Sequence, residues 1–203
     1  MSAVLVINPG STSKKYALYH ERKSVLSFQF EKTISSYELS TTSSVGVQDY
    51  KTISSDEYDS ALMTVSHDIN KYLREHQLQL EKICIRIVSP GSYFQKHQKI
   101  DEAFMIALRQ KEMSVPLHIP VTLQEIQACK KLFPALPLFG ISDSAFHSSL
   151  PKKSRMFSID RSDAETYDIY RFGYHGLSVA SVVRRIHPQT GLNPSRLIVC
   201  HVG

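Results

Sequence analysis

The first 30 residues carry the pattern of short β-strands joined by tight turns, and this opening constrains the fold more than any other feature. The apolar run Val4–Ile7 is typical of a central strand that is covered on both faces. Gly10 follows in a turn, and apolar residues then alternate with polar ones. The predicted strands cover residues 3–8, 15–20 and 26–30. A chain that opens with such an antiparallel meander is not an all-helical protein.

Helical and strand patterns alternate in the rest of the chain. Residues 34–56 are rich in Ser and Thr, which predicts loops and short irregular strands. Ser54 and Glu57 have the spacing of a capping box, which predicts a helix over 57–76. Further predicted strands cover 82–88, 138–142 and 197–201, and further predicted helices cover 101–111, 120–133 and a segment from 178 onward. The order β-β-β-α-β-α-β predicts an α/β domain with a mixed β-sheet flanked by helices.

Composition excludes several classes of protein. The chain has 203 residues, of which 42% are hydrophobic and 21% are charged, as in ordinary globular domains. No apolar run approaches the ~18 residues of a membrane span, and the N-terminus lacks the basic region of a signal peptide. The net charge of +5 is scattered along the chain, so it forms no clustered footprint for nucleic acid. We expect a cytoplasmic protein that binds neither nucleic acid nor membrane.

The three cysteines are Cys84, Cys129 and Cys200. Their odd number and wide spacing match neither a disulfide framework nor a zinc site. We therefore expect buried, reduced thiols.

The turn after the first strand is the first candidate site. Glycine permits a tight turn whose backbone N–H groups and hydroxyls can hold a phosphate, and a nearby lysine adds positive charge. The turn is not a Walker A loop, because a strand follows it in place of a helix. An ordinary polar hairpin explains the same residues. The residues that would meet the phosphate are Ser11, Thr12, Ser13 and Lys15.

Two further features are consistent with an anionic ligand. Arg86 lies inside an apolar strand, and a buried guanidinium needs an anionic partner, either a ligand or a structural salt bridge. Four histidines stand at predicted strand ends or beside Gly or Pro, which is consistent with a shared polar site, although a lone histidine is more often structural. No HExxH spacing occurs, which argues against zinc. These histidines are His118, His147, His175 and His201.

Six segments, in the same order, resemble the acetate kinase family of acetate and propionate kinases. Residues 6–16, VINPGSTSKKY, are similar to the opening signature VINxGSSSxKY. The other five resemble HRVVHGG, PLHNP, FDTAFH, RYGFHG and the start of HLGNG. They are residues 85–88 (IRIV), 116–120 (PLHIP), 143–147 (DSAFH), 171–176 (RFGYHG) and 201–203 (HVG). Six ordered segments across the whole chain are far more specific than any one of them.

The resemblance implies an actin-like, ribonuclease H-like ATPase fold of two similar domains with the active site between them. Residues 1–203 would form the N-terminal acyl-kinase domain, and the second domain, with most of the adenosine site, would lie outside this chain. The implied reaction transfers the γ-phosphoryl group of ATP to acetate or a similar short-chain carboxylate, with Mg²⁺ as cofactor, and gives ADP and an acyl phosphate. The full-length protein would be a homodimer. We expect residues 1–203 alone to fold but not to turn over ATP.

The resemblance also implies roles for single residues. Arg86 would bind the carboxylate and the transferring phosphoryl group, and His175 would donate a hydrogen bond to the transition state. Asp143, with Asn8, would place magnesium. The residues that would face the ATP phosphates are Ser11, Thr12, Ser13, Lys15, His201 and Gly203. The residues that would bind or enclose the substrate are Arg86, Val88, Leu117, His118 and Tyr174.

The sequence departs from the motifs of the family at six positions. They are Ile85, Ser89, Pro90, Ile119, Tyr174 and Val179. The residues tied most directly to chemistry, Asn8, Arg86, Asp143 and His175, are kept. The retained pair of Arg86 and His175 favours the N-terminal half of an active acyl kinase over the alternative, a divergent, catalytically weak module for interaction or dimerisation. We expect these four side chains to converge on one open face.

Overall fold

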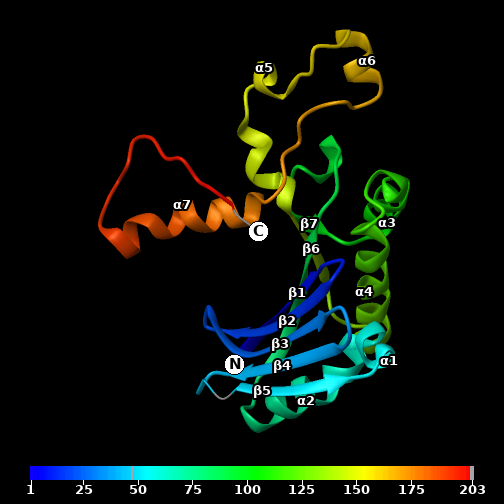
Figure 1. Ribbon diagram of the computed structural model, residues 1–203, viewed down its shortest axis with the longest axis vertical. Coiled ribbons are helices and arrows are strands. Elements are labelled where there is room, and N and C mark those ends of the chain that lie inside the picture. The colour runs from blue at the N-terminus through cyan, green and yellow to red at the C-terminus, as the bar shows by residue number, and fades with distance from the viewer. Residues whose placement is uncertain (47, 202–203) are drawn as a thin grey trace. The chain divides into compact units, whose positions relative to one another are not determined.

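The computed structural model describes residues 1–46 and 48–201, which form two compact units (Figure 1). The first unit combines Met1–Ile87 with Gln98–Gly140. The second combines Val88–His97 with the chain from Ile141 onward. Among the described residues, no helix is long and apolar enough to cross a membrane.

An eight-stranded mixed sheet is the framework of the first unit, in the order β5-β4-β3-β2-β1-β6-β8-β7. Strands β1 to β5 pair antiparallel in sequence order, β1 pairs parallel with β6, and β7 pairs antiparallel with β8. The strands are β1 (Ser2–Pro9), β2 (Ser13–His20), β3 (Lys23–Lys32), β4 (Tyr37–Ser43), β5 (Gln48–Ile53), β6 (Gln79–Ile87), β7 (Gln98–Lys99) and β8 (Leu138–Ser142). The predicted opening meander and the predicted strands over 82–88 and 138–142 are therefore confirmed.

Helices cover one face of this sheet. They are α1 (Ser55–Asp59), α2 (Ala61–Glu75), α3 (Glu102–Gln110) and α4 (Ile119–Leu132). Helix α2 packs against β2 and β3, and α4 packs against β1 and β6 (Figure 1). Alternate residues of β1, such as Leu5 and Ile7, are fully buried beneath these helices, whereas Val4 and Val6 on the other face are half-buried. The expected coverage of this strand is thus confirmed for one face only.

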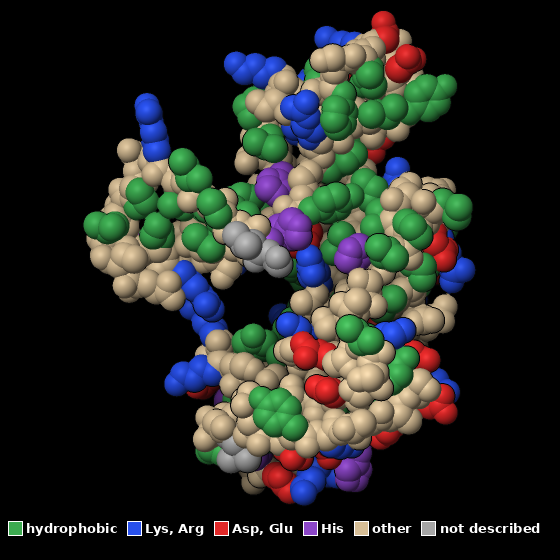
Figure 2. Space-filling view, in the orientation of Figure 1, with side chains coloured by type: hydrophobic (Ala, Val, Ile, Leu, Met, Phe, Trp, Pro, Cys, Tyr) green, Lys and Arg blue, Asp and Glu red, His purple; other side chains and the backbone are tan. Residues whose placement is uncertain are grey.

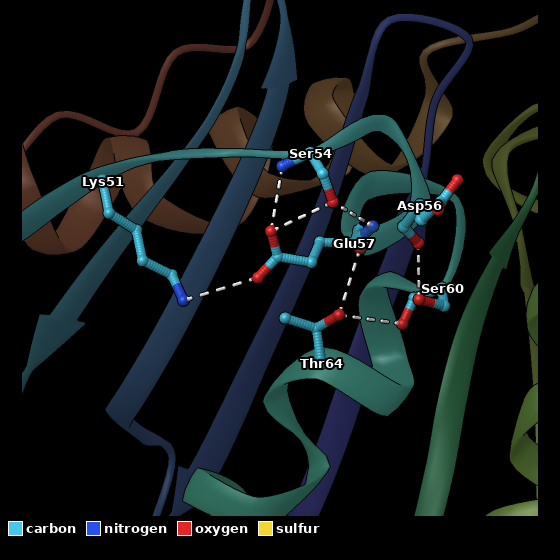
Figure 3. Close-up of polar contacts among 6 residues, drawn as sticks. All are labelled: Lys51, Ser54, Asp56, Glu57, Ser60 and Thr64. Atoms are coloured by element: carbon cyan, nitrogen blue, oxygen red, sulfur yellow. Dashed lines mark hydrogen bonds and ion pairs between the residues drawn. The ribbon is translucent and has the colours of Figure 1, made fainter.

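The predicted capping box is present at the start of α1 (Figure 3). Ser54 Oγ accepts a hydrogen bond from Glu57 N at 3.2 Å, and the Glu57 carboxylate accepts one from Ser54 N at 2.9 Å. The predicted helix over 57–76 is interrupted, however, at Ser60. Asp56 O accepts hydrogen bonds from Ser60 N at 2.9 Å and from the Ser60 hydroxyl at 2.6 Å. Glu57 O accepts one from the Thr64 hydroxyl at 3.1 Å, so a side chain satisfies a carbonyl that a continuous helix would bond through its backbone.

Residues 34–56 differ from the prediction of loops and irregular strands. Most of them form β4 and β5, two regular antiparallel strands with a continuous register from Tyr37 opposite Ile53 to Thr42 opposite Gln48. The sequence pattern is weak because only Leu39 and Ile53 of these strands are buried in the apolar core. Backbone pairing of β4 with β3 and of β5 with β4, and not apolar periodicity, therefore forms these strands.

The second unit is mainly helical. It contains 3-10 helices over Ser92–Phe94 and Asp143–Ser149, and the helices α5 (Lys152–Arg155), α6 (Arg161–Thr166) and α7 (Gly176–Thr190). Asp168 accepts hydrogen bonds from Ser92 N at 2.9 Å and from Ser92 Oγ at 2.6 Å, which ties residues 88–97 to the rest of the unit. Helix α7 packs against the 3-10 helix over Asp143–Ser149.

The helix predicted from residue 178 onward is confirmed as α7. Its Val182 and Val183 are 40% and 45% exposed, and Figure 2 shows hydrophobic side chains on its surface. Two expectations for the C-terminal part are wrong, namely the strand over 197–201 and the burial of Cys200. The segment predicted as a strand, 197–201, has no strand structure, and Ile198 is 91% exposed. A strand needs a hydrogen-bonded neighbour, and the described chain offers none there. Cys200 is also exposed, in contrast to buried Cys129.

Candidate active site

The turn between β1 and β2 is closed tightly. Gly10 N donates to Ser13 O at 2.8 Å. A Cβ at residue 10 would lie 2.8 Å from that same oxygen, so only glycine permits this close approach. Thr12 O accepts a hydrogen bond from Lys32 N at 3.0 Å, which ties the turn to the end of β3. Ser11 and Thr12 are exposed, where their hydroxyls can meet an anion.

Asn8, Lys15 and Arg86 lie on the sheet face opposite α2 and α4. Asn8 and Lys15 are cross-strand partners in β1 and β2. Arg86 NH1 donates to Asn8 Oδ1 at 3.1 Å. This bond helps to orient the planar guanidinium. A hollow of about 450 Å³ on this face has Asn8 and Lys15 in its lining.

The segment before α4 supplies the other predicted site residues of the first unit. His118 caps the start of the helix, and its carbonyl accepts hydrogen bonds from Thr122 N at 3.0 Å and Thr122 Oγ1 at 2.8 Å. Pro120 stands in the first turn, as predicted. The neighbouring Leu117 side chain is 68% exposed.

In the second unit, Asp143 lies directly against the start of α7. Its side chain is 1% exposed, and its Oδ1 accepts a long hydrogen bond from Leu177 N at 3.4 Å. The approach depends on Gly176, where a Cβ would lie only 2.0 Å from Asp143 O. The positive end of the α7 dipole thus faces the Asp143 carboxylate.

His175 is held in a strained backbone conformation just before α7. Its φ of 57° lies in the left-handed region, which is uncommon for residues other than glycine. Its ring stacks on that of His201, with centroids 4.2 Å apart. His201 Nδ1 in turn lies 3.1 Å from Ser178 Oγ, a residue of the first turn of α7. Two predicted site histidines, His175 and His201, are therefore in contact within this unit.

The residues before His175 are anchored to the Asp143–Ser149 helix. His147 Nε2 lies 2.9 Å from Tyr174 O, within hydrogen-bond reach. The Ser144 hydroxyl lies 3.1 Å from Gly173 O and 3.3 Å from Ser89 O, and it can donate to either. Tyr174 is 42% exposed, and partial burial of its phenol raises the pKa of that hydroxyl above its usual value. Val88 is 9% exposed.

A sequence profile of the Acetokinase family matches residues 3–203. The chain belongs to this family. An acetate kinase of Dichelobacter nodosus is 29% identical over an alignment of 209 residues, which covers 100% of this chain and 52% of the relative. An acetate kinase of Natranaerobius thermophilus is 31% identical over 213 residues, covering 98% and 52%. The chain thus spans about half the length of these curated relatives.

Solved structures agree with this assignment. A propionate kinase from Francisella tularensis matches with a TM-score of 0.77 and 25% identity, over 93% of this chain and 49% of that protein. An acetate kinase from Porphyromonas gingivalis shares the fold with a TM-score of 0.74 at 24% identity, over 95% and 50%. The predicted actin-like α/β fold class of this acetokinase-family chain is therefore confirmed.

The structure brings the predicted residues together in two groups. Asn8, Arg86 and the turn lie in the first unit, and Asp143, His175 and His201 lie in the second. Convergence of all four kept side chains on one face stays a prediction. Gly203, predicted to meet phosphate, lies outside the described residues.

Sequence reasoning did not assign roles to the residues that support this site. Gly176 makes the approach of α7 to Asp143 possible, and Gly173, with a φ of +73°, faces the His147 ring where a Cβ would lie 2.4 Å away. Ser144 joins two segments of the unit through its hydroxyl. Both glycines fall inside the segment RFGYHG, so their spacing around residues 174–175 was the available signal.

Oxygen donors for magnesium are present in both units. Among the described residues, no group of three His, Cys, Asp or Glu side chains gathers to hold a metal ion. Magnesium is usually held by one or two carboxylates, together with water and substrate phosphates. The Asp143 carboxylate in the second unit and the Asn8 amide oxygen in the first are each an oxygen donor of the kind that magnesium prefers.

Proposed function

We propose that the chain is the N-terminal half of an ATP-dependent carboxylate kinase. It would help to transfer the γ-phosphoryl group of ATP to acetate or a similar short-chain carboxylate, giving ADP and an acyl phosphate. The observation that carries the proposal is Arg86, whose guanidinium is oriented by Asn8 in a chain that the acetokinase family matches from residue 3 to 203. The relatives that this chain matches are acetate and propionate kinases, which supports this substrate class.

The chemistry requires positioning more than proton transfer. A carboxylate is already ionised at neutral pH, so its oxygen attacks the γ-phosphorus without a general base. The bond from the γ-phosphorus to the bridging oxygen breaks, and ADP leaves with its electron pair. Such a reaction is accelerated by aligning the two anions and by stabilising the charge that the transferring group carries.

The residues of the first unit would hold both anions. The planar fork of Arg86 suits a carboxylate and a phosphoryl group equally. Ser11, Thr12 and Ser13 would meet the ATP phosphates through hydroxyls and N–H groups of the turn, and Lys15 would add a positive charge. His118 would line the acceptor side in a supporting role.

The residues of the second unit would stabilise the transition state and the metal. His175 would donate a hydrogen bond to an equatorial oxygen of the transferring group, with His201 stacked on its ring. Asp143 would hold magnesium, with Asn8, and the metal would neutralise phosphate charge. Val88, Leu117 and Tyr174 would enclose the alkyl group of the acceptor, and the Tyr174 hydroxyl would add a polar contact to that pocket. We also expect the full-length protein to be a cytoplasmic homodimer.

The test is an acyl phosphate trapping assay with hydroxylamine. The protein encoded by the complete reading frame is supplied with Mg-ATP and, separately, acetate, propionate or butyrate. We expect hydroxamate from at least one acid, loss of at least 100-fold in the Arg86→Ala variant, and little change in a Lys71→Met control on the exposed surface of α2. The absence of product with all three acids in the unmodified protein would overturn the proposal.

A further inference from the structure

A buried ion pair lies behind the turn that precedes β2. Lys14 Nζ is 3.1 Å from Glu125 Oε1, and the two side chains are only 4% and 3% exposed. Lys14 belongs to β2 and Glu125 to α4, so the pair joins the sheet to the helix that covers it. It lies on the opposite face from Lys15, because successive side chains of a strand point to opposite faces.

The contacts of this pair fix the lysine from several sides. Lys14 Nζ also donates to Asp59 O at 3.1 Å and lies 5.3 Å from the centre of the Tyr58 ring. The negative charge of Glu125 adds to burial in raising the pKa of the Tyr16 hydroxyl well above its usual value. The charges therefore sit in a layer that is otherwise formed by apolar and aromatic side chains.

Stability alone is a poor explanation for such a pair. Replacing a buried ion pair by apolar residues of similar volume is often neutral or stabilising, because desolvation offsets the attraction between the charges. The pair does determine which face of the sheet each β2 side chain points to, since the lysine ammonium meets the buried Glu125 carboxylate on only one of the two faces. The sequence makes this choice necessary by placing Lys14 and Lys15 side by side.

Lys14 lies close enough to the turn for the ion pair to affect the geometry of the turn. Lys14 is the first buried side chain after the turn, since Ser11 and Thr12 are exposed and Ser13 is half-buried. Its backbone pairs with Pro9, next to the pair formed by Asn8 and Lys15. A slip of one residue would exchange the two lysines, moving Lys15 behind the sheet and away from Asn8.

We propose that Lys14 and Glu125 are positioning residues that set the geometry of the phosphate-binding turn and hold Lys15 on the open face beside Asn8. Tyr16 and Leu18 fix the register of the strand further along, and the ion pair extends it to the edge of the turn. Because α4 begins beside His118, the same pair links the turn to a second segment of the site. This proposal depends on the proposed function in one respect, namely that the turn binds phosphate.

The first test reads the turn without any enzyme activity. The double variant K14M/E125M removes both charges and keeps similar volumes. Amide exchange is followed by NMR in this chain at Gly10 N–H and Lys32 N–H, whose acceptors are Ser13 O and Thr12 O. We expect both amides to exchange at least about tenfold faster relative to Ile83 N–H, which bonds Pro137 O away from the turn.

The matched control is K71M/E75M, which removes the exposed ion pair of α2 and should leave these ratios within about twofold. Unchanged ratios in K14M/E125M, or equal acceleration of all three amides, would overturn the proposal, since the pair would then be only structural. If the double variant does not fold, E125D keeps the charge and shortens its reach. A smaller selective rise at Gly10 and Lys32 supports the proposal, and no rise overturns it.

The second test uses the full-length protein. We expect K14M/E125M to raise the KM for ATP at least about fivefold with a smaller change in kcat, and K71M/E75M to change neither. An unchanged KM beside a loosened turn would overturn the link to phosphate binding. If the unmodified protein forms no acyl phosphate at all, the proposed function fails, while the exchange ratios still decide whether the pair positions the turn.

Discussion

The approach of α7 to Asp143 can be tested with a single methyl group at residue 176. In Gly176→Ala, the new Cβ would lie 2.0 Å from Asp143 O, whereas a relaxed carbon–oxygen contact is about 3.3 Å or longer. The start of α7 would therefore have to move by about 1.3 Å, against backbone that cannot rotate away. Overpacking of a well-packed site typically costs about 1–3 kcal/mol. We expect the upper end, about 3 kcal/mol, because the opposing atom is a backbone oxygen.

Thermal unfolding followed by circular dichroism measures this loss. For a domain of 150–250 residues it corresponds to a drop in Tm of roughly 6–12 °C. The stacked rings of His175 and His201 supply a local readout, because ring-current shifts in the NMR spectrum of their protons report the 4.2 Å stacking. We expect these shifts to diminish in Gly176→Ala.

Gly191 provides the matched control for this substitution. It lies at the other end of α7 with a φ of +71°, and a Cβ there would meet no atom within 4 Å. Gly191→Ala should therefore cost only backbone strain, about 1–2 kcal/mol. Equal losses in the two variants, or a Gly176→Ala variant with an unchanged Tm and unchanged histidine shifts, would refute the steric reasoning.

Three further predictions concern single side chains. Arg86→Ala should lower kcat for acyl phosphate formation in the full-length protein by at least 100-fold, about 3–4 kcal/mol. Arg86→Lys should restore little of this activity, because an ammonium cannot reproduce a bidentate fork. A near-normal hydroxamate yield from the alanine variant would show that this residue is structural. Ser54→Ala should destabilise the first unit by about 1 kcal/mol in urea unfolding, because the α1 cap shown in Figure 3 is lost. An unchanged midpoint of urea unfolding would contradict a stabilising role for this cap. Burial, followed by the charge of Glu125, raises the pKa of the Cys129 thiol from 9.0 to about 12. Above pH 9 the unfolded chain loses this proton and the folded chain keeps it, so this thiol should lower stability as pH rises from 9 to 12. Cys129→Ala should flatten that part of the pH–stability curve, and at pH 8 a thiol reagent should modify exposed Cys200 well before Cys129.

Local signals in the sequence predict most of the central sheet. The alternation in residues 26–30 reports one buried face directly, and the capping box at Ser54 and Glu57 locates the start of α1. The strands over Tyr37–Ser43 and Gln48–Ile53 were predicted only as loops and short irregular strands, because their side chains are mostly polar and their order comes from backbone pairing. Residues 197–201 show the opposite case, an apolar run that pairs with no strand among the described residues.

The sequence alone determined the meander, the glycine turn, and the identity of the charged and polar residues that the family motifs share. These features follow from interactions between residues close in the chain, such as the periodicity of a strand and the approach of Gly10 N to Ser13 O. The tertiary structure alone decided which of two adjacent lysines is buried, because only the packing of α4 on the sheet brings Glu125 to Lys14. It also decided why residue 176 must be glycine, since Asp143 O lies 33 positions earlier in the chain and reaches the start of α7 only in the folded unit. Contacts between residues so far apart depend on the whole arrangement of the backbone, which no local pattern encodes.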